Sequence, residues 1–145
     1  MTVATIRSGP STGTEPVNAL LDTATLLFLD GGGRRLSGTA RAAIESEATQ
    51  LFMSIVSTWE FYVKTTVKKL QLPEPIPAFV ARLRDAYGIA LIDMVETDLM
   101  PLEQLPMYHR DPFDRVLIAQ SIARGFTVVS PDVMLRRYED AHILW

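Results

Sequence analysis

The chain has 145 residues, of which 48% are hydrophobic and 21% charged, and its net charge is −3 at pH 7. This length and composition fit one soluble globular domain, and the negative charge argues against binding nucleic acid through overall charge. The chain has no cysteine, which excludes a disulfide scaffold, thiol catalysis and thiolate zinc sites and fits a reducing cytoplasm.

Three further features of the sequence limit the class of protein. The chain has two histidines, His109 and His142, too few for a histidine-rich site, so a metal would be held by oxygen ligands, which favour Mg²⁺ or Mn²⁺. No apolar run approaches the ~18 residues of a membrane span, and we expect no membrane contact. Residues 1–17 are rich in Ser, Thr, Gly and Pro and lack a signal-peptide core. We therefore expect a flexible leader at 1–17 and a single domain at 18–145.

From residue 18 onward, short apolar runs alternate with helical patterns. In chain order we expect a strand at 18–23, helices at 24–30 and 38–48, a strand at 51–56, helices at 57–70 and 77–87, a strand at 89–92, helices at 96–105 and 112–124, a strand at 126–130, a helix at 133–138 and an edge strand at 143–145. Such alternation is typical of a parallel sheet with helices on both faces. The sequence predicts a three-layer α/β/α fold with a central, mainly parallel sheet of four to five strands.

The helix after the second strand carries two polar signals. Ser57 and Glu60 fit a capping box. Glu60 and Lys64 form an i, i+4 pair in the favourable order. A glutamate at position 60 can therefore be explained by the stability of the helix alone, without any role in chemistry. Trp59 and Phe61 lie in an apolar helix, and we assign them to core or dimer packing rather than to base stacking.

A pair of acids opens the helix at 112–124. Asp111 is a suitable N-cap, Pro112 a suitable first helical residue, and Asp114 falls at the third position on the same end. One interpretation is a well-capped helix whose dipole favours early carboxylates. The other is half of a metal site.

The remaining acids decide between these interpretations by their place in the predicted sheet. Asp22 ends the first strand, and Glu60 opens the helix after the second. Asp132 follows the fourth strand. Carboxyl ends of parallel strands meet at one rim, where sites form in such sheets. Asp111 and Asp114 join that rim because their helix must run antiparallel to the strands.

Acids gathered on one rim favour metal chemistry. Carboxylates without cationic partners repel one another, and burial raises their pKa values. A divalent cation removes that repulsion, and Mg²⁺ binds a few carboxylates together with phosphate oxygens of a substrate. Such a site suits phosphodiester hydrolysis. We assign the metal first to Asp114, on the inward face of its helix, and keep Asp111 as a cap and auxiliary acid.

Four motifs resemble those of PIN-domain ribonucleases and, more narrowly, of VapC-type toxins from bacterial toxin–antitoxin pairs. They are Leu-Leu-Asp-Thr at 20–23, Ser-Ile-Val-Ser-Thr-Trp-Glu at 54–60, His-Arg-Asp-Pro-Phe-Asp-Arg at 109–115 and Gly-Phe-Thr-Val-Val-Ser-Pro-Asp at 125–132. The third is the most specific, and the resemblance covers residues 18–145.

The resemblance implies a Mg²⁺- or Mn²⁺-dependent endoribonuclease. The residues it implies as metal-binding acids are Asp22, Glu60, Asp114 and Asp132, with Asp111 as a fifth catalytic contributor. It also implies an RNA substrate, a homodimer and inhibition by a small antitoxin protein. Thr23 and Ser54 or Ser57 could orient these acids.

Other interpretations stay open. Ala24 stands where the family usually has a polar residue, which leaves a catalytically weak metal-binding scaffold that acts through partner binding. A phosphatase or receiver-like domain would need a phosphate loop or a lysine after the last strand, and Ser130-Pro131-Asp132 offers neither.

The charged neighbours of the acids have two interpretations each. Arg110 and Arg115 are suited either to RNA phosphates or to salt bridges with nearby carboxylates. We interpret His109 as an exposed loop residue rather than a phosphate contact, because it has no partner in the sequence pattern.

Overall fold

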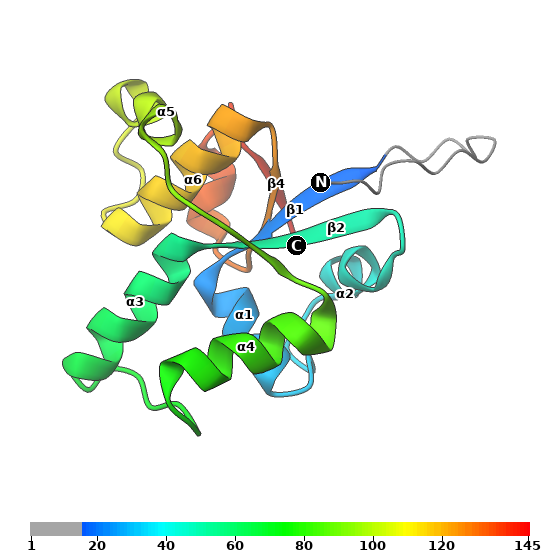
Figure 1. The fold of residues 1–145 in the computed structure, drawn as a ribbon. Helices are drawn as coiled ribbons and strands as arrows, with labels where there is room; N and C mark the ends of the chain where they lie inside the picture. The colour runs from blue at the N-terminus through cyan, green and yellow to red at the C-terminus, as the bar shows by residue number, and fades with distance from the viewer. Residues whose placement is uncertain (1–15) are drawn as a thin grey trace.

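Five parallel strands form one sheet at the centre of residues 16–145, the part of the chain that this computed structural model describes (Figure 1). They are β1 (Val17–Leu21), β2 (Thr49–Ser54), β3 (Ala90–Ile92), β4 (Thr127–Val129) and β5 (His142–Leu144). Their order is β3-β2-β1-β4-β5, so the chain fills the sheet outward from β1 in both directions. The point of reversal lies between β1 and β4, where open parallel sheets form a crevice beyond the strand ends.

Helices cover both faces of this sheet. The α-helices are α1 (Thr23–Asp30), α2 (Gly38–Glu45), α3 (Ile55–Thr66), α4 (Ile76–Tyr87), α5 (Glu96–Leu99) and α6 (Pro112–Arg124), and the 3₁₀ helices are η1 (Met100–Gln104) and η2 (Val133–Arg137). Figure 1 shows α1 to α4 on one side of the sheet and α5 and α6 on the other. The predicted three-layer α/β/α fold is confirmed.

Alternate strand residues supply the core of each layer. Ala19 and Leu21 point into the cluster formed with α1 to α4. Leu20, between them, packs against Leu117 of α6, and Val128 packs against Ile118 of the same helix. Because residues 19–21 of β1 are buried on both faces of the sheet, this part of the strand is a continuous apolar run rather than an alternating one.

The N-terminal boundary differs slightly from the expected one. Val17, the last residue that we assigned to the leader, is the first residue of β1 and bonds through its N–H to the carbonyl of Ala48 at 3.2 Å. Residues 1–15 of the expected leader lie outside the described residues. Within the described range, no helix has the length and apolarity needed to cross a membrane.

Most helices begin and end close to the predicted positions. α6 spans the predicted residues, with Asp111 as N-cap and Gly125, at φ 69°, as C-cap. The helix predicted at 57–70 instead begins at Ile55, because the hydroxyl of Ser54 accepts the N–H of Val56 at 3.1 Å and caps it. The predicted capping box of Ser57 and Glu60 is therefore wrong, and both side chains are free for other contacts.

Candidate active site

The first acid stands at the junction of β1 and α1. Asp22 is the N-cap of α1, and its Oδ1 accepts the N–H of Thr25 at 2.8 Å. Its own N–H donates to the carbonyl of Val129 in β4 at 3.2 Å, which fixes it beside the reversal point of the sheet. The residue is 4% exposed, and burial is the main cause that raises the pKa of its carboxyl, with Glu60 adding to the rise.

Glu60 lies on the inner face of α3, in the second turn after the end of β2. It is 3% exposed. Its Oε1 is 2.6 Å from the hydroxyl oxygen of Thr23, and its Oε2 pairs with the ammonium of Lys64. The hydroxyl of Ser57 is 3.0 Å from that of Thr23. Ser57 thus extends a polar chain between α1 and α3 and does not cap the helix.

Asp111 and Asp114 stand together at the start of α6. The Oδ1 of Asp111 accepts the N–H of Phe113 at 2.9 Å, so the predicted cap is confirmed. Asp114, on the next turn, has a pKa raised to about 7, first by desolvation and then by the charge of Asp111. Asp22 and Glu60 also raise it, so the charges of three neighbouring carboxylates act on Asp114.

Asp132 follows β4 and caps η2. Its Oδ1 accepts the N–H of Met134 at 2.9 Å, and its own N–H donates to the hydroxyl of Ser130 at 3.1 Å. The Ser130 side chain also bonds to the carboxylate of Asp22 and partly offsets the rise in its pKa. Asp132 therefore belongs to the same rim as the other acids.

The structure gives His109 a place that sequence reasoning missed. Its Nε2 is 2.7 Å from Oδ2 of Asp132 and 3.2 Å from Oδ2 of Asp114. The side chain is 18% exposed, so the interpretation as an exposed loop residue is wrong. The three groups lie close enough together to hold a metal ion. No local signal could have revealed this, because Asp132 is 23 residues away in the sequence.

The donor set fits a divalent cation. Five acids share a partly desolvated rim, three of them as helix N-caps, and desolvation together with the charges of neighbouring acids raises the pKa of Asp114. Lys64 supplies an ammonium group that pairs with this cluster. Its hydrogen bond to Glu60 is the main cause that raises its pKa, and the charges of Asp111 and Asp114 add to the rise. The groups that could hold a metal here are carboxylates apart from His109, and carboxylates suit Mg²⁺ or Mn²⁺.

The arginine beside the acids has a structural role instead. Both amino groups of Arg115 donate to backbone carbonyls, Nη1 to Pro106 at 2.8 Å and Nη2 to Leu105 at 3.3 Å. Arg115 therefore holds the loop that precedes His109 and makes no carboxylate salt bridge within residues 16–145, whereas its contact with RNA phosphate stays a prediction. Arg110 is exposed and makes no ion pair within residues 16–145.

Comparison with known proteins agrees with the fold described above. The family model of the PIN domain matches residues 19–141. Among curated protein sequences, none matches the chain. A solved structure of VapBC2 from Rickettsia felis bound to a promoter DNA fragment is similar with a TM-score of 0.65 and 12% identity, over 88% of this chain and 97% of that one.

Two further solved structures show the same fold. VapBC-1 from nontypeable Haemophilus influenzae has a TM-score of 0.62 at 10% identity, over 88% of this chain and 96% of that one. VapBC-5 from Mycobacterium tuberculosis, a member of the VapBC family of toxin–antitoxin systems, has a TM-score of 0.56 at 14% identity, over 88% and 98%.

Proposed function

The chain belongs to the PIN domain family, and on that premise we propose that it is a metal-dependent endoribonuclease acting as the toxin of a toxin–antitoxin pair. PIN domains are generally nucleases. The observation that carries the proposal is the cluster of carboxylates at one rim of the sheet, where the pKa of Asp114 is raised to about 7 by desolvation and by neighbouring acids. We assign the nuclease to residues 18–145.

In the proposed site, Asp22, Glu60, Asp114 and Asp132 hold Mg²⁺ or Mn²⁺, and Asp111 is the auxiliary acid. When bound, the metal lowers the pKa of water and stabilises charge on the phosphate. The protein itself holds these carboxylates in position. Three of them are helix N-caps, and Glu60 is held by Thr23 and Lys64. Preorganised ligands of this kind reduce the reorganisation that binding requires.

The RNA substrate is supported by the charges around the rim. Lys64 reaches the acids from α3, and Arg110 stands exposed next to Asp111. Arg137 lies over the ring of Tyr108, 4.3 Å from its centre, and both residues line a cleft whose lining includes none of the proposed metal ligands. Such groups suit phosphates and bases of a single strand. The lack of cysteine fits action in the cytoplasm.

The antitoxin partner is supported by the similar solved structures, which are VapBC toxin–antitoxin proteins. Their sequence identity to this chain is low, so the inference of an antitoxin partner rests on the shared fold. We propose that a small antitoxin binds this chain and restrains its nuclease activity. Co-expression with the protein encoded next to it should yield a stable complex in which RNA cleavage is suppressed.

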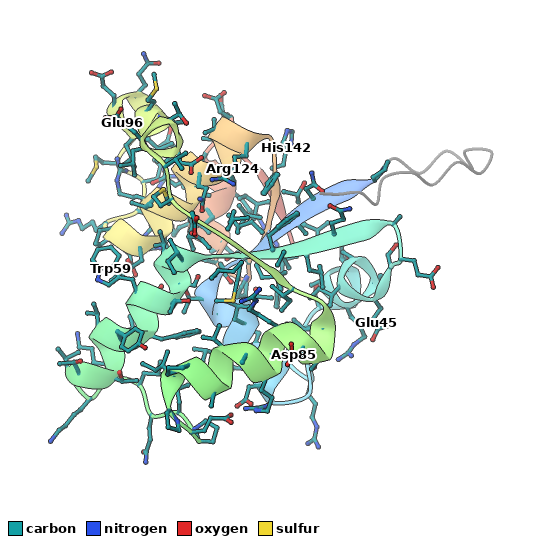
Figure 2. The ribbon with its side chains drawn as sticks, viewed as in Figure 1. Glu45, Trp59, Asp85, Glu96, Arg124 and His142 are labelled. Atoms are coloured by element: carbon teal, nitrogen blue, oxygen red, sulfur yellow. The ribbon has the colours of Figure 1, made fainter. Side chains whose placement is uncertain are left out.

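We also propose a homodimer with α3 in the interface. Apolar side chains lie exposed along one face of this helix. They are Ile55, Trp59, Tyr62, Val63 and Val67, between 36% and 55% exposed. Trp59 lies on the side of α3 near the start of α6, where it meets the ring of Phe113 edge-on at 4.7 Å (Figure 2). An exposed apolar face of this length is typical of an association surface.

The alternative is a metal-binding scaffold that acts through partner binding, and Ala24 is the feature that favours it. The two functions differ in cleavage. We expect purified protein to cleave RNA in the presence of Mg²⁺ or Mn²⁺, and we expect EDTA to stop the cleavage. Titration calorimetry that detects Mn²⁺ binding without any RNA cleavage would favour the scaffold instead.

A further inference from the structure

His109 is the one imidazole of the rim, and it contacts three of the acidic residues at once. Its Nε2 approaches carboxylate oxygens of Asp132 and Asp114 at 2.7 and 3.2 Å. Its other ring nitrogen, Nδ1, accepts the backbone N–H of Asp111 at 3.1 Å. A histidine in such a cluster has two possible roles, ligand of the metal or hydrogen-bond donor to its ligands, and the two require different tautomers.

The contact at Nδ1 decides the tautomer. A backbone N–H can only donate, so Nδ1 of His109 must present a lone pair to Asp111. In the neutral ring the proton is then on Nε2, where it points at the carboxylates. One N–H shared between two acceptors is a common geometry. The shorter distance makes Asp132 the main acceptor and Asp114 the second.

A metal-binding histidine has the opposite arrangement. It gives the lone pair of one nitrogen to the metal and donates the N–H of the other to a carbonyl, carboxylate or water. If Nε2 of His109 bound a metal, Nδ1 would have to carry the proton, and that proton would face the N–H of Asp111. The spacing of His109, Asp114 and Asp132 is compatible with a metal, but the hydrogen bonding is not.

We propose that His109 is a positioning residue which donates its Nε2–H to Asp132 and Asp114 and is not a ligand of the metal. The proposal rests on the proposed metal-dependent function. In this role His109 joins the loop before α6 to the segment after β4 and sets the direction in which both carboxylates present their remaining lone pairs. The metal site is then built from carboxylates alone.

The backbone around His109 is fixed as such a role requires. The N–H of His109 donates to the hydroxyl oxygen of Tyr138 at 2.9 Å, and Tyr138 is 2% exposed in the core beside α6. Arg115 holds the two carbonyls just upstream, as described above. Asp132 is held on its other oxygen by the N–H of Met134. Donor and acceptor therefore start from fixed positions on both sides.

The first test reads the tautomer directly. Nitrogen-15 NMR of the imidazoles at mildly alkaline pH distinguishes a neutral Nε2–H ring from a neutral Nδ1–H ring and from a doubly protonated one. His142, the other histidine, is exposed at β5 and serves as the internal reference. We expect His109 to show Nε2–H without metal and to keep it when Mg²⁺, which is diamagnetic, is added. An Nδ1–H or doubly protonated ring, or a switch to Nδ1–H with Mg²⁺, would overturn the proposal.

The second test uses two variants of the same residue and measures Mn²⁺ affinity by calorimetry. The amide of His109→Gln can place an N–H donor near the position of Nε2, whereas His109→Ala has no donor. We expect affinity to fall by roughly 10-fold or more in His109→Ala, the size typical of lost outer hydrogen bonds to metal ligands, and to recover most of that loss in His109→Gln. Equal affinity in the two variants, whether both weakened or both unchanged, would contradict the positioning role.

Folding and metal binding are checked separately. Thermal unfolding shows whether each variant is folded, and His142→Ala is the matched control that should leave Mn²⁺ affinity unchanged. If the unmodified protein binds neither Mg²⁺ nor Mn²⁺, the proposed function fails. The NMR result without metal still decides whether His109 donates to the two carboxylates.

Discussion

The hydroxyl oxygen of Thr23 lies 2.6 Å from Oε1 of Glu60, so the first residue of α1 holds the carboxylate that α3 brings to the site. A hydroxyl has one proton, and the charged acceptor at the shorter distance takes it. Ser57, at 3.0 Å, then donates its own proton to Thr23. This chain of three buried side chains ties α1 and α3 together at the proposed metal site.

Removing the Thr23 hydroxyl should weaken both the fold and the site. In Thr23→Val, Oε1 of Glu60 loses a buried donor, and we expect about 1–3 kcal/mol of destabilisation in urea unfolding and roughly 10-fold weaker Mn²⁺ binding. Thr66→Val is the matched control, because the Thr66 hydroxyl bonds a helix carbonyl at the exposed end of α3. A Thr23→Val protein as stable as this control would contradict the role of Thr23.

Protein stripped of metal by EDTA should lose stability as the pH rises through the range in which Asp114 ionises. Its pKa is raised from 3.8 to about 7, so the folded state binds a proton that the unfolded state releases, and stability falls between about pH 4 and pH 7. The fall is at most about 4 kcal/mol, at about 1.4 kcal/mol per pKa unit. Asp114→Asn should flatten this decline in thermal unfolding and gain less from added Mn²⁺.

Two results would contradict that expectation. One is an unmodified protein whose stability in EDTA does not change over this pH range. The other is an Asp114→Asn protein that Mn²⁺ stabilises as much as the unmodified chain.

Acid stability should depend on an ion pair away from the site, between α5 and α6. Asp98 is 2% exposed and bonded by Arg124, which lies beneath α5 (Figure 2). Its hydrogen bonds from Arg124 are the main cause that lowers the pKa of Asp98 from 3.8 to about 2. The pKa of Asp98 is lowered, whereas that of Asp114 is raised, so the two groups affect stability in opposite directions as the pH changes. About 2 kcal/mol of stability is present above pH 4 and is lost as the pH falls toward 2.

Breaking this pair from one side should be costly at neutral pH as well. Arg124→Met leaves the buried Asp98 carboxylate without its cation, and we expect roughly 3–5 kcal/mol of destabilisation in urea unfolding. Arg82→Met is the matched control, because Arg82 pairs with Asp30 and Glu74 at the surface. If the two variants unfold at the same urea concentration, the buried pair does not stabilise the fold.

The oligomeric state should depend on the exposed face of α3. Val67→Glu places a charge on this face, and we expect it to shift the protein from dimer to monomer in light scattering coupled to size exclusion. Val133→Glu, at a valine that is 66% exposed on η2, is the matched control. A monomer before substitution, or a dimer that both variants leave unchanged, would exclude the proposed interface.

The sequence was most informative where local rules act alone. α6 has its predicted bounds because Asp111, Pro112 and Gly125 are start and stop signals that need no tertiary contact. The common rim of the acids followed from the alternation of strands and helices. The start of α3 could not be placed as well, since Ser54 and Ser57 are equally good caps and the burial of Ser57 against Thr23 decides between them.

The contacts that the sequence could not reveal are those between distant segments. His109 meets Asp132 across 23 residues, and Thr23 meets Glu60 across 37. We expected that Thr23 could orient an acid, but neither this threonine nor the histidine in its loop has a periodic or capping signal that identifies its partner. Such contacts depend on how closely the loops at the strand ends approach, which the order of elements alone does not determine.

RNA cleavage by a pair of aspartate variants shows whether the acidic rim acts as the site of a nuclease. Asp114 stands on the acidic rim, whereas Asp85 is exposed on α4, away from it (Figure 2). With Mg²⁺ or Mn²⁺, we expect the unmodified protein and Asp85→Asn to cleave RNA at equal rates and Asp114→Asn to lose cleavage by at least about 100-fold, as expected for the loss of a metal ligand. Undiminished cleavage by Asp114→Asn would contradict the proposed metal-dependent cleavage at this rim.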